Sequence, residues 1–194
     1  PAMSAHLVIR DATLADAEAM ARIQVDGWNR AYASFIPDQL PAAYDIGIRH
    51  AQWRERLAAP DPGTVHLLAA EGDAVLAIAS GGPPLRDEVI VEGNTDAYTA
   101  QVYGLYVTPT RYGGGIGRRI LGELATRFAH QGHQNLCLWA FELNPFRRFY
   151  DRLGGQRVAQ AEWRIADTII TEIAYGWPEI GDLIWACSSE GKTE

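Results

Sequence analysis

The amino-acid sequence predicts a single α+β domain, built on one mixed, mostly antiparallel sheet with helices packed against it. The chain has 194 residues, enough for one buried core with room for a cleft. Stretches of helical periodicity alternate along it with short β-type runs. Two such runs, at 65–70 and 75–80, are separated by Glu71-Gly72-Asp73, a turn typical of an antiparallel hairpin. We therefore expect strands and helices to share one core.

The residues before this hairpin predict one strand followed by two helices. Leu7 to Arg10 is β-type, and Thr13-Leu14-Ala15-Asp16 resembles a capping box at the start of a helix. Apolar positions from Ala17 to Tyr32 then recur at spacings of three and four, which indicates that helix. A second stripe of this kind, from Ile46 to Leu57, predicts another helix.

The residues after the hairpin predict the rest of the sheet and two more helices. In order, these elements are a strand at 98–107, a helix at 116–132, a strand at 136–141, a helix at 144–154 and two strands at 157–165 and 168–175. Ala166-Asp167 suits the turn between the last two strands. Residues 81–97 have loop composition at both ends, and we interpret them as a surface insertion around the brief β-type run 89–91.

Composition and charge narrow the classes of function. With 17 basic and 24 acidic side chains the net charge is −7, which argues against a nucleic-acid-binding protein and favours a cationic partner. No apolar run approaches the ~20 residues of a membrane span, and the first residues do not resemble a secretory signal. Two cysteines cannot form a disulfide framework or a four-ligand zinc site. We expect a cytoplasmic protein that binds no membrane and no metal.

The most informative motif is a glycine-rich loop at the start of a helix. Arg111-Tyr112-Gly113-Gly114-Gly115-Ile116-Gly117-Arg118 joins the strand at 98–107 to the helix after it. Glycines at a helix N-terminus let several backbone N–H groups approach a phosphate closely. A P-loop would need Gly-Lys-Ser/Thr, and a dinucleotide fingerprint would need a parallel sheet and a later acidic residue. The motif therefore predicts a different kind of phosphate cradle, with a flexible turn as the alternative.

Further residues place this loop in an ordered pattern. Val107 at the end of the strand, Tyr112 to Gly117 in the loop, Asn144 after the next strand, and Tyr150 together resemble the GCN5-related N-acetyltransferase (GNAT) family. Trp28-Asn29-Arg30-Ala31-Tyr32 in the first helix is also similar to that family. The pattern predicts a family relationship because several elements occur in the same order.

The resemblance covers about residues 7–175 and implies a fold. This is a single-domain GNAT-like fold, with a mixed, mostly antiparallel central sheet of about seven strands flanked by about four helices. It implies a GNAT-like acetyltransferase domain at 7–178. We expect residues 1–6 to be an expression scar and flexible start, and residues 179–194 to be a C-terminal tail.

The resemblance also implies that acetyl-coenzyme A (acetyl-CoA) is the acyl donor and co-substrate. In the family, the backbone of the strand before the loop meets the pantetheine arm and the thioester carbonyl, while the loop holds the pyrophosphate. The cofactor-binding positions it implies are Leu105, Tyr106, Val107, Tyr112, Gly113, Gly115, Ile116, Gly117, Arg118 and Asn144. The side chains of Leu105 and Val107 also suit a core, and Asn144 also suits a helix N-cap.

Tyr150 matches the family's general acid, which protonates the coenzyme A thiolate. A phenol with an ordinary pKa of about 10 is protonated at neutral pH and can deliver its proton to a nearby sulfur. The alternative is a core tyrosine packed with Phe146, Phe149 and Leu153.

Two positions depart from the family pattern. Tyr112 occupies the position of an Arg or Gln, and Gly104 occupies a strand position where the family often carries Glu. The base that deprotonates the acceptor must therefore come from elsewhere. Glu142 lies near the expected cofactor, although it equally suits a solvated strand end, while Glu88, Glu92 and Asp96 belong to the insertion and also suit its surface. A water chain to a remote carboxylate is the other route.

These residues favour an enzyme that transfers acetyl from acetyl-CoA to a primary amine of a small molecule or peptide, by direct attack in a ternary complex. One alternative is a non-catalytic acyl-CoA-binding regulatory module, which Gly104 and Tyr112 would fit. The acidic net charge favours a cationic acceptor, and a homodimer is possible by analogy. Residues that suit an aromatic acceptor pocket, or equally core packing, are Trp28, Tyr32, Phe35, Trp139 and Trp163.

Overall fold

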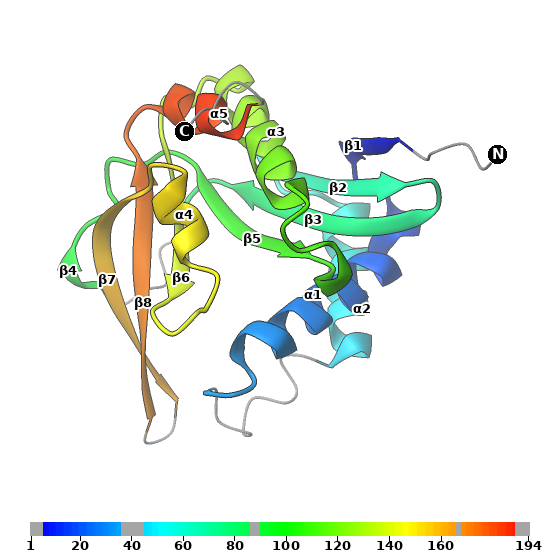
Figure 1. Ribbon diagram of the computed structural model, residues 1–194, viewed down its shortest axis with the longest axis horizontal. Coiled ribbons are helices and arrows are strands. Elements are labelled where there is room, and N and C mark those ends of the chain that lie inside the picture. Colours follow the sequence, from blue (N-terminus) through cyan, green and yellow to red (C-terminus); the bar gives the residue numbers. More distant parts are fainter. Residues whose placement is uncertain (1–5, 36–44, 86–89, 166–167, 189–194) are drawn as a thin grey trace.

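The computed structural model describes residues 6–35, 45–85, 90–165 and 168–188. Within them eight strands form one sheet in the order β1-β2-β3-β5-β6-β8-β7-β4 (Figure 1). The strands are β1 (Leu7–Asp11), β2 (Val65–Glu71), β3 (Ala74–Gly82), β4 (Ile90–Gly93), β5 (Gln101–Val107), β6 (Leu136–Phe141), β7 (Gln156–Ile165) and β8 (Thr168–Trp177). The helices are α1 (Ala17–Tyr32), α2 (Ile46–Ala58), α3 (Ile116–His130), α4 (Arg148–Arg152) and α5 (Ile180–Cys187).

Helices cover both faces of the sheet. Helices α3, α4 and α5 pack on one face, and α1 and α2 pack on the other (Figure 1). Neighbouring residues of β2 show the two sides, because Leu67 belongs to the core under α3 and Leu68 to the core under α1 and α2. Both side chains are fully buried. Burial on two faces explains why β2 is apolar at successive positions rather than alternately.

The predicted fold class is confirmed. Every pair of neighbouring strands among the described residues is antiparallel except β5 and β6, so the sheet is mixed and mostly antiparallel. Gly132 follows α3 with a φ of 94°, as a C-terminal cap requires. The turn expected at 166–167 lies outside the described residues.

Several element boundaries differ from the prediction. The sheet has eight strands rather than about seven, because Ile90–Gly93 pairs with β7 and adds an edge strand. Gly81 and Gly82 belong to β3, so the interpretation of 81–97 as an insertion is wrong at its start, whereas β4 agrees with the brief β-type run predicted within it. The helix expected at 144–154 is confined to Arg148–Arg152.

The residues after 179 also differ from expectation. Where we expected a tail, Ile180–Cys187 forms α5, which makes five helices rather than about four. Leu183 is fully buried, and Cys187 lies directly against Gly122 of α3. Helix α5 is therefore part of the core. No helix within the described part of the chain has the length and apolar character needed to cross a membrane.

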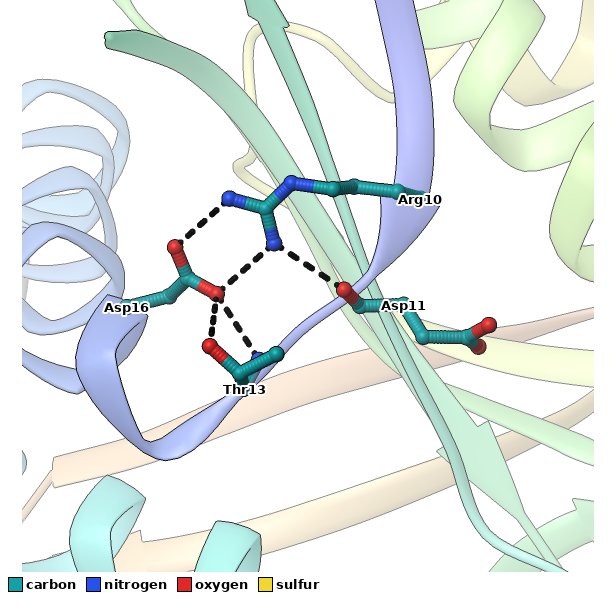
Figure 2. Close-up of polar contacts among 4 residues, drawn as sticks. All are labelled: Arg10, Asp11, Thr13 and Asp16. Carbon is teal, nitrogen blue, oxygen red and sulfur yellow. Dashed lines mark hydrogen bonds and ion pairs between the residues drawn. The ribbon is translucent and has the colours of Figure 1, made fainter.

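Asp16 joins β1 to the start of α1 (Figure 2). Its two carboxylate oxygens accept hydrogen bonds from the Arg10 guanidinium, both at 2.8 Å. One of them also accepts hydrogen bonds from the Thr13 N–H at 2.7 Å and the Thr13 hydroxyl at 2.8 Å. The predicted capping box is thus confirmed. The Arg10 hydrogen bonds are the largest cause lowering the pKa of Asp16 to about 2.

We predict that Asp16→Asn lowers the free energy of unfolding by about 2 kcal/mol at pH 7. The pKa is depressed in the folded state, so the ionised carboxylate stabilises the fold fully above its ordinary value of 3.8. That contribution is lost as the pH falls toward 2, and the difference from the parent protein should shrink accordingly. Urea denaturation between pH 7 and pH 3 measures both effects.

Glu18→Gln is the matched control for this substitution. It removes an exposed carboxylate that pairs with Arg22 on α1, and such surface pairs contribute little. Equal unfolding midpoints for the two variants would contradict the structural role of Asp16.

Candidate active site

The parallel strands β5 and β6 separate partway along their length. They pair only over 101–102 and 137–138, while β5 continues to Val107 and β6 to Phe141. Beyond the paired part, backbone polar groups that would otherwise join the two strands face the gap between them. A cleft of about 530 Å³ occupies this gap, which is the size of a typical small-molecule site.

The glycine loop lies along this cleft. Gly113 and Gly115 have φ angles of 79° and 76°, which favour glycine, and a Cβ at either position would meet no atom within 4 Å. Helix α3 starts directly after Gly115, and its first amides have no acceptor within the helix. The Arg119 N–H is bonded within the helix, to the Gly115 carbonyl at 3.0 Å. Open space beside the free N–H groups of a helix N-terminus is an arrangement that can hold an anion.

Arginine side chains also line the cleft. Arg118 is in the first turn of α3, and Arg148 and Arg152 are on α4. Arg111, just before the glycines, pairs with Glu71. This gathering of positive charge in a chain of net charge −7 favours an anionic ligand. We did not predict Arg148 and Arg152 from the sequence, although the clustered arginines after Asn144 were a visible signal.

Tyr150 lines the cleft from α4 and packs against other aromatic rings. Its ring centroid lies 5.4 Å from that of Phe149 and 5.5 Å from that of Tyr175. Burial is the main cause that raises the pKa of Tyr150, and the Tyr106 and Tyr175 phenols add to it. The hydroxyl therefore stays protonated at neutral pH and is suited to donate a proton. Tyr150 therefore both lines the cleft and packs against neighbouring rings, so the two roles considered from the sequence are compatible.

Asn144 ties the segment before α4 to α1. Its Nδ2 donates a hydrogen bond to the Tyr32 hydroxyl at 2.8 Å, and its Oδ1 accepts one from the Phe146 N–H at 2.8 Å. The side chain is buried. Because α4 begins only at Arg148, the expected N-cap role of Asn144 is wrong, and the residue instead closes the turn that precedes the helix.

Tyr106 explains the glycine at position 104. Its ring lies between Gly27 of α1 and Gly104 of its own strand. A Cβ at Gly27 would approach Tyr106 Cδ1 to 2.8 Å, and one at Gly104 would approach Tyr106 Cε2 to 2.9 Å. A side chain at position 104 would therefore collide with this ring, which excludes a carboxylate there.

The structure brings every predicted site residue to one cleft. The lining includes Leu105, Tyr106, Val107, Tyr112, Gly113, Gly115, Ile116, Gly117, Arg118, Asn144 and Tyr150. The carboxylates considered as a base are not among the lining residues: Glu142, Glu92 and Asp96 are exposed elsewhere, and Glu88 lies outside the described residues. No three His, Cys, Asp or Glu side chains gather to hold a metal ion in the described ranges.

Comparisons with known proteins agree with this geometry. The sequence model of the FR47-like protein family matches residues 88–164, which span β5, the glycine loop, α3, β6 and α4. The uncharacterized N-acetyltransferase YuaI of Bacillus subtilis (strain 168) is 25% identical over 177 residues, covering 91% of this chain and 96% of that protein. A crystal structure of a GNAT-family protein from Desulfovibrio desulfuricans matches with a TM-score of 0.66 and 21% identity, over 90% of this chain and 99% of that one. The resemblance to the GNAT family that the sequence predicted is thus confirmed, in the matched sequence and in the fold.

Another GNAT-fold structure was solved with its ligand. YncA of Salmonella typhimurium, in a structure with its cofactor acetyl-CoA, has a TM-score of 0.63 and 22% identity, over 90% of this chain and 94% of that one. In the present chain, Tyr112 is at the position where the GNAT family pattern has Arg or Gln. Its ring lies 5.1 Å from that of Phe146, and the Arg30 guanidinium lies 5.6 Å from its centre. Tyr112 thus connects the glycine loop to α1 by packing.

We predict that Asn144→Ala lowers the free energy of unfolding by about 2 kcal/mol, because it removes a buried side chain and takes the hydrogen-bond partner from both the half-buried Tyr32 hydroxyl and the Phe146 N–H. Urea denaturation measures this loss. Asn135→Ala is the matched control: Asn135 also bridges two segments, with hydrogen bonds to Thr99 and Ala97, but these hydrogen bonds are exposed and water can replace them. A smaller loss for Asn144→Ala than for Asn135→Ala would contradict the assignment.

Proposed function

We propose that this protein is an acetyl-CoA-dependent N-acetyltransferase that acetylates a primary amine of a small molecule or peptide. One observation carries the proposal: a separated parallel strand pair leads directly to a glycine cradle at a helix N-terminus, with a protonated phenol in the same cleft. This arrangement can hold a long phosphorylated thioester and donate a proton to its sulfur. The resemblance to the GNAT family and the acetyltransferase names of the relatives support the same activity.

The donor would lie along β5, with its phosphates at the glycine loop. The N–H groups of Gly113, Gly115, Gly117 and Arg118 are the donors we assign to the pyrophosphate, because that contact does not depend on side-chain identity. Open space at Gly113 and Gly115 fits such a group. The Arg118 side chain lines the same cleft and adds positive charge.

The acetyl group would lie where β5 leaves β6. We assign the backbone of Leu105, Tyr106 and Val107 to the pantetheine arm and to the thioester carbonyl, whose developing negative charge their N–H groups would stabilise. The amine nitrogen forms a bond to the carbonyl carbon, and the carbon–sulfur bond breaks. Tyr150 gives its proton to the departing sulfur, and the proton lost by the amine passes to a base.

A non-catalytic acyl-CoA-binding module is the second candidate function. Gly104 favours it, because Tyr106 excludes a carboxylate from that strand position. The two functions differ in one observable, the release of coenzyme A in the presence of amines. A protein that binds acetyl-CoA but releases none with any amine would support the second function.

We predict that Tyr150→Phe lowers the rate of coenzyme A release about 100-fold and changes acetyl-CoA affinity less than about twofold. The substitution removes only the proton donor and keeps the ring packing. Thiol release and calorimetry with acetyl-CoA measure the two quantities. Tyr98→Phe is the matched control, because it removes another buried phenol outside the cleft. Full turnover in Tyr150→Phe would exclude its role as the acid.

We predict that Gly115→Val lowers acetyl-CoA affinity more than about tenfold, since a branched side chain would fill the cradle and disfavour the left-handed backbone. Calorimetry measures the affinity. Gly72→Val provides a matched control: Gly72 also has a positive φ, 59°, with no atom near its missing Cβ, but it lies in the β2–β3 turn. Equal losses of affinity in the two variants would show that backbone strain, and not the cradle, is responsible.

A further inference from the structure

Two arginines of α4 line the donor cleft without a carboxylate partner. Arg148 and Arg152 lie four residues apart, and therefore on one side of this short helix. Within the described part of the chain, neither guanidinium group has an ion pair or a hydrogen bond. Like charges at this spacing destabilise a helix. The arrangement therefore costs stability in the free protein and is relieved when an anion binds.

The one carboxylate of α4 is used elsewhere. Asp151 lies between the two arginines in the sequence, but its Oδ1 is 3.8 Å from Nε of Arg157 on β7. Asp151 is also not among the residues that line the cleft. Arg111, at the other end of the glycine loop, is paired with Glu71. Arg148 and Arg152 are thus available to a ligand in the cleft, whereas Arg111 already has a partner.

Two contacts place α4 beside the anion cradle. The ring of Phe146, just before the helix, lies 5.1 Å from the ring of Tyr112 in the glycine loop. A Cβ at Gly117, in the first turn of α3, would lie 3.9 Å from Cζ of Phe149. Arg148 comes between these two phenylalanines in the sequence. The arginines of α4 therefore add positive charge beside the backbone donors of the cradle.

A pair of guanidinium groups suits a different phosphate from the one assigned to the cradle. A phosphate monoester carries about two negative charges at neutral pH, more than a phosphate bridged within a diphosphate chain. Arginine binds such a group through two parallel hydrogen bonds. Coenzyme A contains both kinds of phosphate: a diphosphate within its chain and a monoester on the 3′ position of its ribose. The cradle and α4 together offer one group of donors for each.

We propose that Arg148 and Arg152 bind the 3′-phosphate monoester of coenzyme A and make the protein select this donor over its dephospho form. The proposal rests on the proposed function, and it names the part of the donor that α4 recognises. It gives the arginines a role in specificity, which the backbone donors of the glycine loop cannot supply, because those contact the diphosphate that both forms share.

Coenzyme A and dephospho-coenzyme A test the proposal, because they differ only in the 3′-phosphate. Calorimetry should show that the parent protein binds coenzyme A at least about tenfold more tightly. The double variant Arg148→Gln, Arg152→Gln should reduce this ratio to less than about twofold. Its affinity for dephospho-coenzyme A should change less than about twofold, since both positions are exposed and their longer-range effects are screened.

Arg147→Gln is the matched control, because it removes the same charge from the neighbouring residue, which does not line the cleft. It should keep the preference of the parent protein. A double variant that retains the preference, or an Arg147→Gln variant that loses it equally, would overturn the proposal. The comparison of the two ligands on the parent protein needs no variant to fold, and equal affinities there would overturn it as well.

The outcomes also separate this inference from the proposed function. Selective binding of coenzyme A, without its release from acetyl-CoA in the presence of any amine, would contradict the proposed function alone. Release of coenzyme A by a protein that binds both ligands equally would contradict this inference alone.

Discussion

The separation of β5 from β6 is the constraint on which the rest of the site depends. Parallel strands that stayed paired would use their backbone groups on each other and leave no gap for a ligand. Here pairing stops after Val102, and the free length of β5 leads straight to the glycine loop. The loop, α3 and α4 are then arranged around that gap. Each element contributes one kind of group: backbone donors from β5 and the loop, positive charge from the arginines, and a phenol from α4.

The packing of Tyr106 limits which side chains β5 can present beside the cleft. Its ring occupies the space above Gly104, so the strand cannot carry a carboxylate at that position. The same ring requires a glycine on α1, at Gly27, which lets that helix approach β5 closely. The close approach brings Tyr32, further along α1, to the cleft and to Asn144. The same Tyr106 ring thus limits the side chain at position 104 of β5 and sets how closely α1 approaches that strand.

Local features of this fold could be predicted from the sequence, whereas long-range ones could not. The glycines at 113 and 115 were informative because their backbone conformation excludes most other residues. Helix α5 was missed because eight residues show too little periodicity. Strand β4 was predicted only as a brief β-type run in an insertion, and not as a member of the sheet, because its partner β7 comes much later in the chain. Glu172, a buried residue of β8, gave no signal, since its strand neighbours Phe141 and Ala161 are brought to it only by the sheet.

Strand β8 has a consequence for the order in which the protein can be completed during synthesis. It follows every residue of the cleft in the sequence, yet it is the antiparallel partner of β6, which forms one wall of that cleft. Helix α5 follows later still and packs against α3, which carries the anion cradle. When Tyr150 has left the ribosome during synthesis, β8 and α5 have not. The strand that pairs with β6 and the helix that packs against α3 are therefore still missing. The donor site can assemble only after residues up to Cys187 have left the ribosome.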